Sequence, residues 1–497
     1  MAKRSIKSKL AKVYGFLGTS RFFKILLVIF VVQAFLIALT GRFPMAFDER
    51  THLGIIEYYA NHLNPFGSYQ APELNQYGLI IHNPSYIYHY LMSFPWRIIT
   101  ALTDNFMAQI ILMRAINIAL FSGAIVIFRK LLLGSKFPKL LINLALLFFI
   151  MTPLVSQVAA QINYDSLFML IVGLSLILTL NIANNLKRQS FKLLENRFLT
   201  LAGLLLTGTL VKYAFLPIIL AIIIYLGWKL YKASQIKQSL TLKIKSFPGR
   251  RSKLKHWAVV IFVVLSFGLF LERYGGNIIR YGSPIPGCSV VLGEKACLNN
   301  TVIERNANYL RTKPSDLLGP AGYTDVWIRH MGYNLMFALN GPHSGHKVGL
   351  PLPLPKLAAT VFGLGGLVLS LVFWRRVFAS LTVRLLGFVI IVYVGILWLN
   401  NYLDYLHFGQ LVAVQGRYLI PVLILVYVVA LLAYQRLFDL LPRLRTPLTT
   451  IAVVCFLAGG GTLTYILRSD PSWYWENNFV VDLNEGAQKI LRPIIPE

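Results

Sequence analysis

Long runs of apolar residues recur along almost the whole chain, beginning with Ile25–Leu39. Runs of roughly 18 or more residues with few charges are typical of helices that cross a membrane. Only 13% of the residues are charged, whereas a soluble domain has about 25%. With 56% hydrophobic residues and a mean hydropathy of +0.62, so much apolar surface cannot be buried in one water-soluble core. The sequence therefore predicts an all-α polytopic membrane protein.

The basic residues are concentrated in short segments beside the apolar runs. The N-terminus up to Lys24 and the segment Lys229–His256 carry many lysines and arginines and no acid. Basic loops of this kind mark the cytoplasmic side and attract anionic lipid head groups. The net charge of +29 is therefore explained by topology and lipid contact, and we expect no nucleic-acid partner. Because Gly41-Arg42-Phe43-Pro44 follows the first run in place of a cleavage site, we expect a retained first helix.

Placing the basic loops inside predicts about 11 transmembrane helices. They lie at about 23–40, 107–128, 140–153, 166–182, as a hairpin of two short helices within 198–228, at 257–271, and centred near 367, 392, 425 and 455. Pro84–Leu102 interleaves aromatic and polar residues, which predicts an interfacial helix. All 19 acidic residues except Glu195 and Asp439 then lie on the external side of the cell (plasma or inner) membrane, although the acids were not used to assign the topology.

This topology predicts a linear division of the chain. It consists of a basic cytoplasmic N-terminus (1–22), an N-terminal transmembrane module (23–271) that includes an external loop (41–106), a large external loop (272–354), C-terminal transmembrane helices (355–467) and an external tail (468–497). We expect the external segments to form a small cap. Cys288 and Cys297 fall in the large external loop and can form a disulfide in an oxidising compartment, whereas Cys455 lies in an apolar run.

The most informative local sequence is Phe47-Asp48-Glu49-Arg50-Thr51-His52, directly after the first helix. Two adjacent carboxylates near a membrane repel each other and are costly to desolvate. One interpretation is that Asp48 only caps a helix that begins at this point. The alternative is that one carboxylate binds a metal or acts as a general base on an acceptor hydroxyl.

Four sites in the sequence resemble the GT-C superfamily of membrane glycosyltransferases. The acidic pair after the first helix is one, and Asn163-Tyr164-Asp165 is similar to the second acidic position of that superfamily. The segment Leu204–Tyr213 resembles its short-helix hairpin, with Lys212 at the turn. Gln415-Gly416-Arg417-Tyr418 and Pro421 resemble the QGRY…P motif of a family of predicted bacterial membrane proteins.

The resemblance implies that module 23–271 is catalytic and that sugar is transferred from a polyprenyl-phosphate donor on the external face. It implies Asp48 as the base, with Glu49 as the alternate, and Asp165 as a support for the acceptor or for a cation. A donor that carries a phosphate needs nearby cations and polar groups, and the candidate substrate-binding residues are His52, Arg417, Tyr418, Lys212, Arg329 and His330. Arg417 is preferred for the lipid phosphate because a guanidinium donates two parallel hydrogen bonds and stays charged.

Simpler interpretations remain open for several of these residues. Asp165 is equally consistent with a helix N-cap, and Arg417 with an interfacial arginine. Arg114 lies in an apolar run and can pair with an acid of an external loop. His343 and His346 are spaced for a metal but are flanked by glycine and proline, which favours ordinary loop residues. We expect no required cofactor, while a Mg²⁺ or Mn²⁺ ion on Asp48 and Asp165 is the alternative.

The preferred hypothesis is a hexosyl- or pentosyltransferase of the cell envelope that inverts the sugar. Its partners are a polyprenyl-phosphate-sugar donor, an external glycan, lipid or protein acceptor, and anionic lipids at the basic loops. A transporter or flippase of lipid-linked sugars is the main alternative. It is disfavoured because transporters place ionisable residues near the bilayer midplane and show repeated halves. A non-catalytic membrane protein is the third alternative.

Overall fold

A computed structural model describes residues 12–46, 48–66, 84–186, 191–236, 250–298, 300–340 and 347–495. The described chain is almost wholly helical, as predicted, and its one sheet is a two-stranded hairpin. It divides into two compact units, each assembled from separated stretches of sequence. The helices α3 (Glu49–His62), α4 (Ile87–Leu102) and α8 (Asp165–Asn185) each begin in one unit and end in the other.

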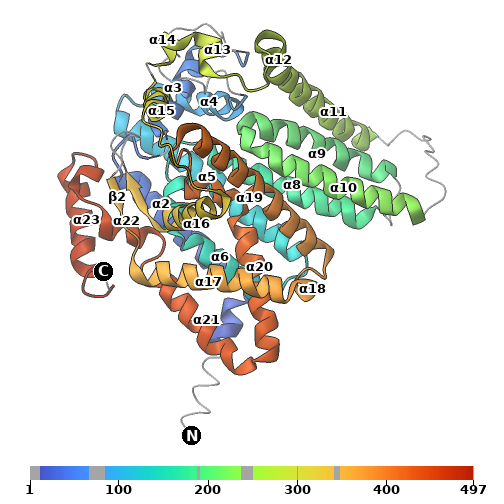
Figure 1. Cartoon of the computed structure of the whole chain (residues 1–497), viewed down its shortest axis with the longest axis vertical. Helices are drawn as coiled ribbons and strands as arrows, with labels where there is room; N and C mark the ends of the chain where they lie inside the picture. The colour runs from blue at the N-terminus through green and yellow to red at the C-terminus, as the bar shows by residue number, and fades with distance from the viewer. Residues whose placement is uncertain are drawn as a thin grey trace. The chain divides into compact units, whose positions relative to one another are not determined.

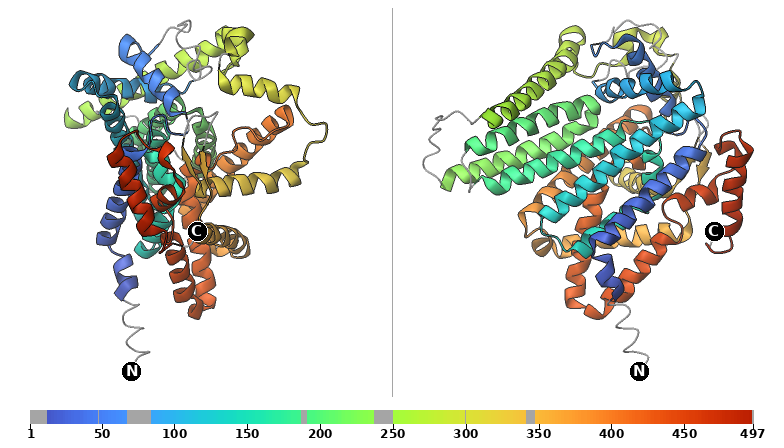
Figure 2. Two further views of the ribbon diagram at one scale, coloured as in Figure 1. Left: turned by 90° about the vertical axis from the view of Figure 1, so that its left-hand side faces the viewer. Right: turned by 180° about the vertical axis from the view of Figure 1, so that it is seen from behind.

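The first unit comprises the described parts of Met1–His52, Ile99–Ser166 and Lys313–Glu497. Its helices pack pairwise through apolar faces, and α2 and α5 lie side by side (Figure 2). Short strands β1 and β2 pair antiparallel, with Ala338 opposite Gly349. Its elements are α2 (Ser20–Thr40), α5 (Phe106–Gly134), α6 (Lys139–Ile150), α7 (Pro153–Ala159), α16 (Pro320–Met336), β1 (Ala338–Asn340), β2 (Lys347–Gly349), α17 (Pro353–Val372), α18 (Trp374–Val377), α19 (Leu381–Phe408), η4 (Gly416–Leu419), α20 (Ile420–Leu440), α21 (Pro442–Leu457), α22 (Thr462–Arg468), η5 (Pro471–Trp473) and α23 (Asn478–Leu491).

Local sequence sets several helix boundaries in this unit. The Asn105 side chain accepts a hydrogen bond from the Ala108 N–H at 3.0 Å and so caps the start of α5. Pro153 begins α7 after a bend of 73° from α6. Between α21 and α22 the chain bends by 45° through Gly459 and Gly461, both of which have a positive φ.

The second unit comprises the described parts of Leu53–Ile98 and Leu167–Thr312. Helices α9, α10 and α11 run alongside one another (Figure 1), and α9 packs closely on α11. Cys288 and Cys297 form a disulfide in the segment that follows. Its elements are α9 (Phe191–Val211), η2 (Tyr213–Phe215), α10 (Leu216–Ile236), α11 (Arg250–Phe270), η3 (Leu271–Gly275, a π-helical turn), α12 (Gly276–Tyr281), α13 (Cys288–Leu292), α14 (Glu294–Cys297) and α15 (Thr301–Arg311).

The long helices expose many apolar side chains, as helices that face lipid do. Along α11 and α17, residues such as Val264, Leu265 and Leu371 are more than half exposed. Such continuous apolar surfaces are rare on water-soluble monomers and are expected where helices face hydrocarbon chains. In the described part of the chain, 8 helices are long and apolar enough to span a membrane, or up to 10 when each bent pair is one span. The prediction of a polytopic all-α membrane protein is therefore confirmed.

The structure differs from the predicted hairpin in helix length. The sequence favoured two short helices within 198–228, but α9 and α10 contain 21 residues each. The polar stretch at Thr207–Thr209 does not interrupt α9, because the side chain of Thr209 bonds back to a carbonyl of its own helix. The break falls at Lys212, whose extended backbone separates α9 from η2. Helix α9 is the predicted span that is not among the helices long and apolar enough to cross a membrane, since its first two turns contain Lys192, Glu195 and Arg197.

Candidate functional site

The acidic turn after α2 places Asp48 at the start of α3. Its carbonyl accepts the first helical hydrogen bond, from the His52 N–H at 2.9 Å. The φ of Asp48 is 67°, in the left-handed region that aspartate tolerates better than most non-glycine residues. Such backbone conformations often occur at functional sites, where surrounding contacts hold them. The observed turn gives the neighbouring carboxylates of Asp48 and Glu49 different surroundings.

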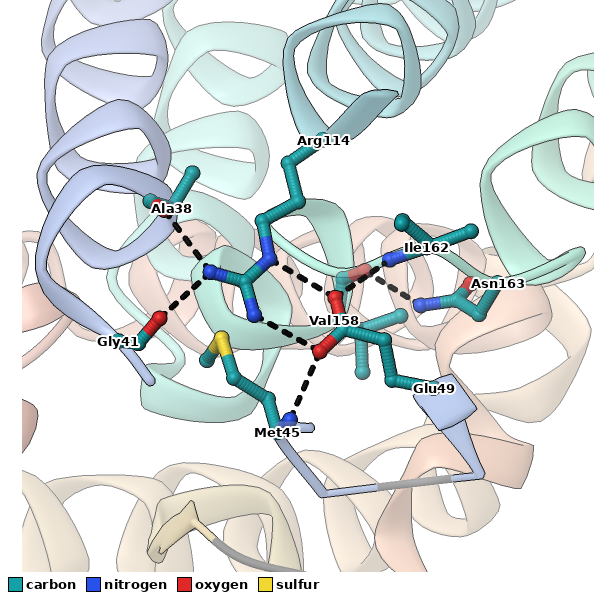
Figure 3. A network of polar contacts seen from close by, with 8 residues as sticks. All are labelled: Ala38, Gly41, Met45, Glu49, Arg114, Val158, Ile162 and Asn163. Carbon is teal, nitrogen blue, oxygen red and sulfur yellow. Dashed lines mark hydrogen bonds and ion pairs between the residues drawn. The ribbon is translucent and has the colours of Figure 1, made fainter. Parts of the chain in front are cut away.

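Glu49 is completely buried and forms an ion pair with Arg114 of α5 (Figure 3). Arg114 donates from Nε to Oε1 at 2.8 Å and from Nη2 to Oε2 at 2.7 Å, which is a bidentate geometry. Two backbone amides complete the shell of the carboxylate: Met45 donates to Oε2 at 2.7 Å and Ile162 to Oε1 at 3.1 Å. Each carboxylate oxygen thus accepts two hydrogen bonds.

The same guanidinium ties this ion pair to the end of α2. Arg114 Nη1 donates to the carbonyl oxygens of Ala38 at 2.9 Å and Gly41 at 2.6 Å. A buried charge pair is tolerated only when its remaining donors and acceptors are satisfied, and this geometry meets that requirement. The pair therefore connects α2, the Gly41–Met45 turn, α3 and α5 at one point. The prediction that Arg114 pairs with an acid of a loop is confirmed, and that acid is Glu49.

Asp48 faces a different cation, Arg417 of η4. Arg417 Nη2 lies 3.2 Å from Asp48 Oδ2, and the side chains are 3% and 18% exposed, respectively. Arg417 also donates to the hydroxyl of Tyr418 at 3.4 Å. Asp48 is thus the more accessible of the two adjacent carboxylates.

The QGRY sequence has a clear packing reason for its glycine. A Cβ atom on Gly416 would lie 2.7 Å from the Leu335 nitrogen and 2.9 Å from the Met331 carbonyl oxygen, both in the backbone of α16. Because backbone atoms cannot rotate away as side chains do, only glycine permits this contact. The close approach of α16 fixes η4 and hence the direction in which Arg417 projects.

The Asp48–Glu49 turn and Arg417 form two parts of an acidic cluster, and Asn163-Tyr164-Asp165 contributes its third part. Asn163 donates to the Val158 carbonyl at 2.8 Å and accepts from the Asp165 N–H at 2.9 Å, which shapes the turn before α8. The Tyr164 ring meets the His52 ring edge-to-face at 4.6 Å. Burial raises the pKa of Tyr164 well above its usual value, and nearby Asp165 and Asp48 raise it further while Arg417 opposes them. Tyr164 therefore stays a neutral hydroxyl beside the charged groups.

The structure thus brings together Asp48, His52, Asp165, Arg417 and Tyr418 of the predicted site residues. Arg329 lies on an exposed face of α16, where it pairs with Asp325 one helical turn away, and His330 is exposed beside it. No contact of Arg329 or His330 with the cluster is recorded among the described residues. His343 and His346 lie outside the described residues.

Lys212 belongs to the second unit and is described within it. It is buried at the break between α9 and η2, with Nζ 5.7 Å from the centre of the Phe168 ring. The next residue, Tyr213, donates its N–H to Ser85 Oγ at 3.0 Å. A role of Lys212 in binding phosphate stays a prediction.

A metal on the acidic residues is the alternative suggested by the sequence. Within the residues that the structure describes, no group of three or more His, Cys, Asp or Glu side chains is arranged to hold a metal ion. Asp48 instead has a guanidinium within ion-pair distance. Arg417 therefore supplies positive charge beside Asp48.

The sequence assigned no role to Tyr164, although the residue lies in the Asn163-Tyr164-Asp165 motif next to Asp165. A signal was present, because a tyrosine between an asparagine turn and an acidic helix start lies where a neutral hydroxyl can meet a carboxylate. The choice of Glu49 over other acids as the partner of Arg114 had no local signal, since the two residues are 65 positions apart.

Two aspartate carboxylates, one guanidinium and a neutral phenol thus gather where α3, α8 and η4 begin. Such an arrangement suits proton abstraction from a hydroxyl beside a bound anion. The family model of dolichyl-phosphate-mannose-protein mannosyltransferase matches residues 24–277, just over half of the chain. The chain belongs to this GT-C family, and it is a membrane glycosyltransferase that uses a polyprenyl-phosphate sugar donor.

No curated protein and no solved structure matches the chain. The family match includes Asp48, Glu49, Arg114 and Asp165 and ends before Arg417. The resemblance of Gln415–Tyr418 to the QGRY…P family therefore stays a prediction.

Proposed function

We propose that this protein transfers a hexose from a polyprenyl-phosphate donor to a hydroxyl of an acceptor on the external face of the cell membrane, with inversion at the anomeric carbon. The observation that carries the proposal is the Asp48–Arg417 pair, at 3.2 Å, in a chain of this family. Mannose is the first sugar to test, because the description of the matched family names it.

In the proposed step, Asp48 takes the proton of the acceptor hydroxyl as its oxygen attacks the anomeric carbon. The new carbon–oxygen bond forms while the bond to the donor phosphate breaks, and polyprenyl phosphate leaves with the electron pair. A single displacement of this kind inverts the configuration. Positioned general-base catalysis contributes about 10²- to 10⁴-fold to a rate.

The surroundings of the two carboxylates support Asp48, and not Glu49, as the base. Glu49 is fully buried, and both of its oxygens already accept hydrogen bonds from Arg114 and from backbone amides. Asp48 is partly exposed and sits on a helix start that this buried pair holds in place. We propose that Glu49 and Arg114 position Asp48, and that Asp165 and Tyr164 hold the acceptor.

Arg417 is the proposed contact of the donor phosphate. Its planar guanidinium matches phosphate geometry and remains charged at all physiological pH values. Because Arg417 pairs with Asp48, an incoming phosphate competes with that carboxylate for the same cation. Donor binding is thereby coupled to the release of Asp48 for proton abstraction. Since this arginine supplies the positive charge, we propose that transfer needs no divalent cation.

The external location rests on the position of the cluster and of the disulfide. Asp48 follows the end of α2, whereas the basic residues Arg129-Lys130 and Arg375-Arg376 lie at the other ends of their helices. Basic helix ends favour the cytoplasmic side, which supports an external position for the cluster. A disulfide between Cys288 and Cys297 also fits an oxidising compartment.

The test is reconstitution of the purified protein with radiolabelled polyprenyl-phosphate mannose, other hexoses and a pentose. We expect mannose transfer, an inverted anomer in the product and no loss of rate with EDTA. Asp48→Asn should lower kcat by about 10²-fold or more because its amide cannot accept the proton. Asp325→Asn, at an exposed carboxylate, is the matched control. Equal transfer by wild type and Asp48→Asn would contradict the mechanism, and loss of transfer with EDTA would contradict its cation independence.

A further inference from the structure

The chain near residue 474 returns to the end of α2 and pairs with the turn that leads to the acidic cluster. Gly41 and Tyr474 form an isolated antiparallel bridge. The Arg42 N–H donates to the Trp473 carbonyl at 2.8 Å, and the Trp475 N–H donates to the Thr40 carbonyl at 3.2 Å. We call residues 473–475 the C-terminal strap. The strap lies about 200 residues beyond the end of the family match at residue 277.

Burial and hydrogen bonds with other residues of the C-terminal segment also hold the strap in place. Trp473 and Tyr474 are buried, and the Tyr474 hydroxyl hydrogen-bonds to that of Ser469. Gln488 of α23 donates to the carbonyl oxygens of Ile466 at 2.7 Å and Ser469 at 2.8 Å, which fastens α23 beside the strap. An ion pair between Arg42 and Glu476 adds little because both side chains are more than half exposed.

Two contacts connect the C-terminal strap to the acidic cluster. The Gly41 carbonyl, in the bridge to Tyr474, accepts a hydrogen bond from Arg114 Nη1 at 2.6 Å. The Trp475 ring lies over the same guanidinium, 5.9 Å from its central carbon. An aromatic face near a guanidinium is attractive and excludes water, which strengthens the neighbouring ion pair. Both contacts meet at Arg114, which holds Glu49 next to Asp48.

The Gly41 turn is packed closely against its neighbours. A Cβ atom at Gly41 would lie 2.8 Å from Met45 Sδ and 2.9 Å from the Ile37 carbonyl oxygen. Met45 in turn donates its N–H to Glu49. A displacement at Gly41 is therefore passed on to both the guanidinium and the carboxylate of the buried pair.

We propose that the C-terminal strap positions the catalytic turn, with Trp475 and the Gly41–Tyr474 bridge fixing the Arg114–Glu49 pair that orients Asp48. This inference rests on the proposed function for the identity of the base. It extends the catalytic unit to residues of the C-terminal segment, far from the matched region. Trp475 acts through Arg114 and touches no reacting atom.

The test compares Trp475→Ala with Trp475→Phe, and with Phe479→Ala as control, since Phe479 is 69% exposed on α23 and lies outside the strap. We expect Trp475→Ala to lower kcat about ten- to hundredfold with the donor KM within about twofold, because small misplacements of a catalytic group have effects of this size. Trp475→Phe should restore most of kcat, and Phe479→Ala should match wild type. An unchanged kcat, or a change confined to KM, overturns the proposal.

A second measurement on the same proteins does not depend on activity. Hydrogen–deuterium exchange should accelerate at the Met45 and Ile162 amides in Trp475→Ala, because both donate to Glu49. Unchanged exchange at these amides overturns the proposal even where kcat falls. If Trp475→Ala does not fold, Trp475→Leu keeps the apolar bulk without the aromatic face and is read in the same way. Full transfer by Asp48→Asn would remove the proposed base, whereas the exchange data would still decide whether the strap holds the turn.

Discussion

At the scale of single residues, the adjacent carboxylates Asp48 and Glu49 are separated by their surroundings. Glu49 is closed off by a bidentate guanidinium and two amides, while Asp48 is partly exposed beside Arg417. The left-handed φ at Asp48 turns the chain between them. A buried ion pair of this kind contributes little net stability relative to an apolar pair, but leaving one partner alone is costly.

Glu49→Gln should therefore destabilise the fold strongly. The substitution removes the negative charge and leaves Arg114 buried without a counterion, which costs about 3–5 kcal/mol. Arg329→Gln, which breaks an exposed pair with Asp325, should cost about 1 kcal/mol or less. Thermal unfolding of the detergent-solubilised variants measures the difference. If the two variants unfold at the same temperature, the Arg114–Glu49 pair does not have the structural role assigned to it.

The double variant Glu49→Met, Arg114→Met separates charge from packing. Replacing both ions with apolar side chains of similar size removes the uncompensated charge, so its stability should exceed that of Glu49→Gln. Its activity should stay low, because Met45, Ile162 and Gly41 lose the groups that bind them. A stable but inactive double variant would distinguish positioning from mere folding.

At the scale of elements, the contact between α16 and η4 directs Arg417. Gly416→Ala should place a methyl group against the backbone of α16, so η4 must shift, at a cost of about 1–3 kcal/mol. Because Arg417 follows directly, transfer should fall more than stability alone explains. Gly332→Ala in α16 is the control, since a Cβ atom at Gly332 would meet nothing within 4 Å. Relative kcat at equal amounts of folded protein is the measurement, and equal kcat for both variants contradicts the assignment.

Elements were predictable where the signal is local. Hydropathy located the spans, and Lys212 marked the break after α9 because a buried charge and an extended backbone interrupt a helix. The length of α9 was not predictable in this way, since Thr209 satisfies its hydroxyl within the helix and leaves it continuous. The disulfide was predicted only on the condition of an oxidising compartment, because pairing also depends on how residues 288 and 297 approach in space.

Contacts between distant segments carried no such signal. The position of Arg114 in an apolar run indicated that it needs an anionic partner, but several acids were available. Packing of α5 against α2 selects Glu49. The strap pairs through backbone atoms, which every residue possesses, so nothing in Trp473–Trp475 indicates Gly41 as its partner. The sequence therefore located the acidic turn, but the groups that hold this turn in place could be identified only from the three-dimensional structure.

At the scale of the whole molecule, the proposed function requires that the acidic cluster and the basic helix ends face opposite sides of the membrane. Single cysteines report this directly. Ser315, before α16, belongs to the segment predicted outside, and Ser380, at the start of α19, follows Arg375-Arg376 on the side predicted inside. Both serines are exposed, so their intrinsic accessibility is matched.

In a Cys455→Ser background, a membrane-impermeant maleimide should label Ser315→Cys in intact cells and Ser380→Cys only after the membrane is opened. Cys288 and Cys297 should stay unlabelled until a reductant is added, because their thiols are joined. The positive-inside rule sets this expectation, since it predicts that Arg375 and Arg376 lie in the cytoplasm. The reverse labelling pattern would place Asp48 in the cytoplasm and contradict transfer to an external acceptor. Activity measured in the same cells with an acceptor that cannot cross the membrane then ties orientation to function, because only an outward-facing Asp48 can reach its hydroxyl.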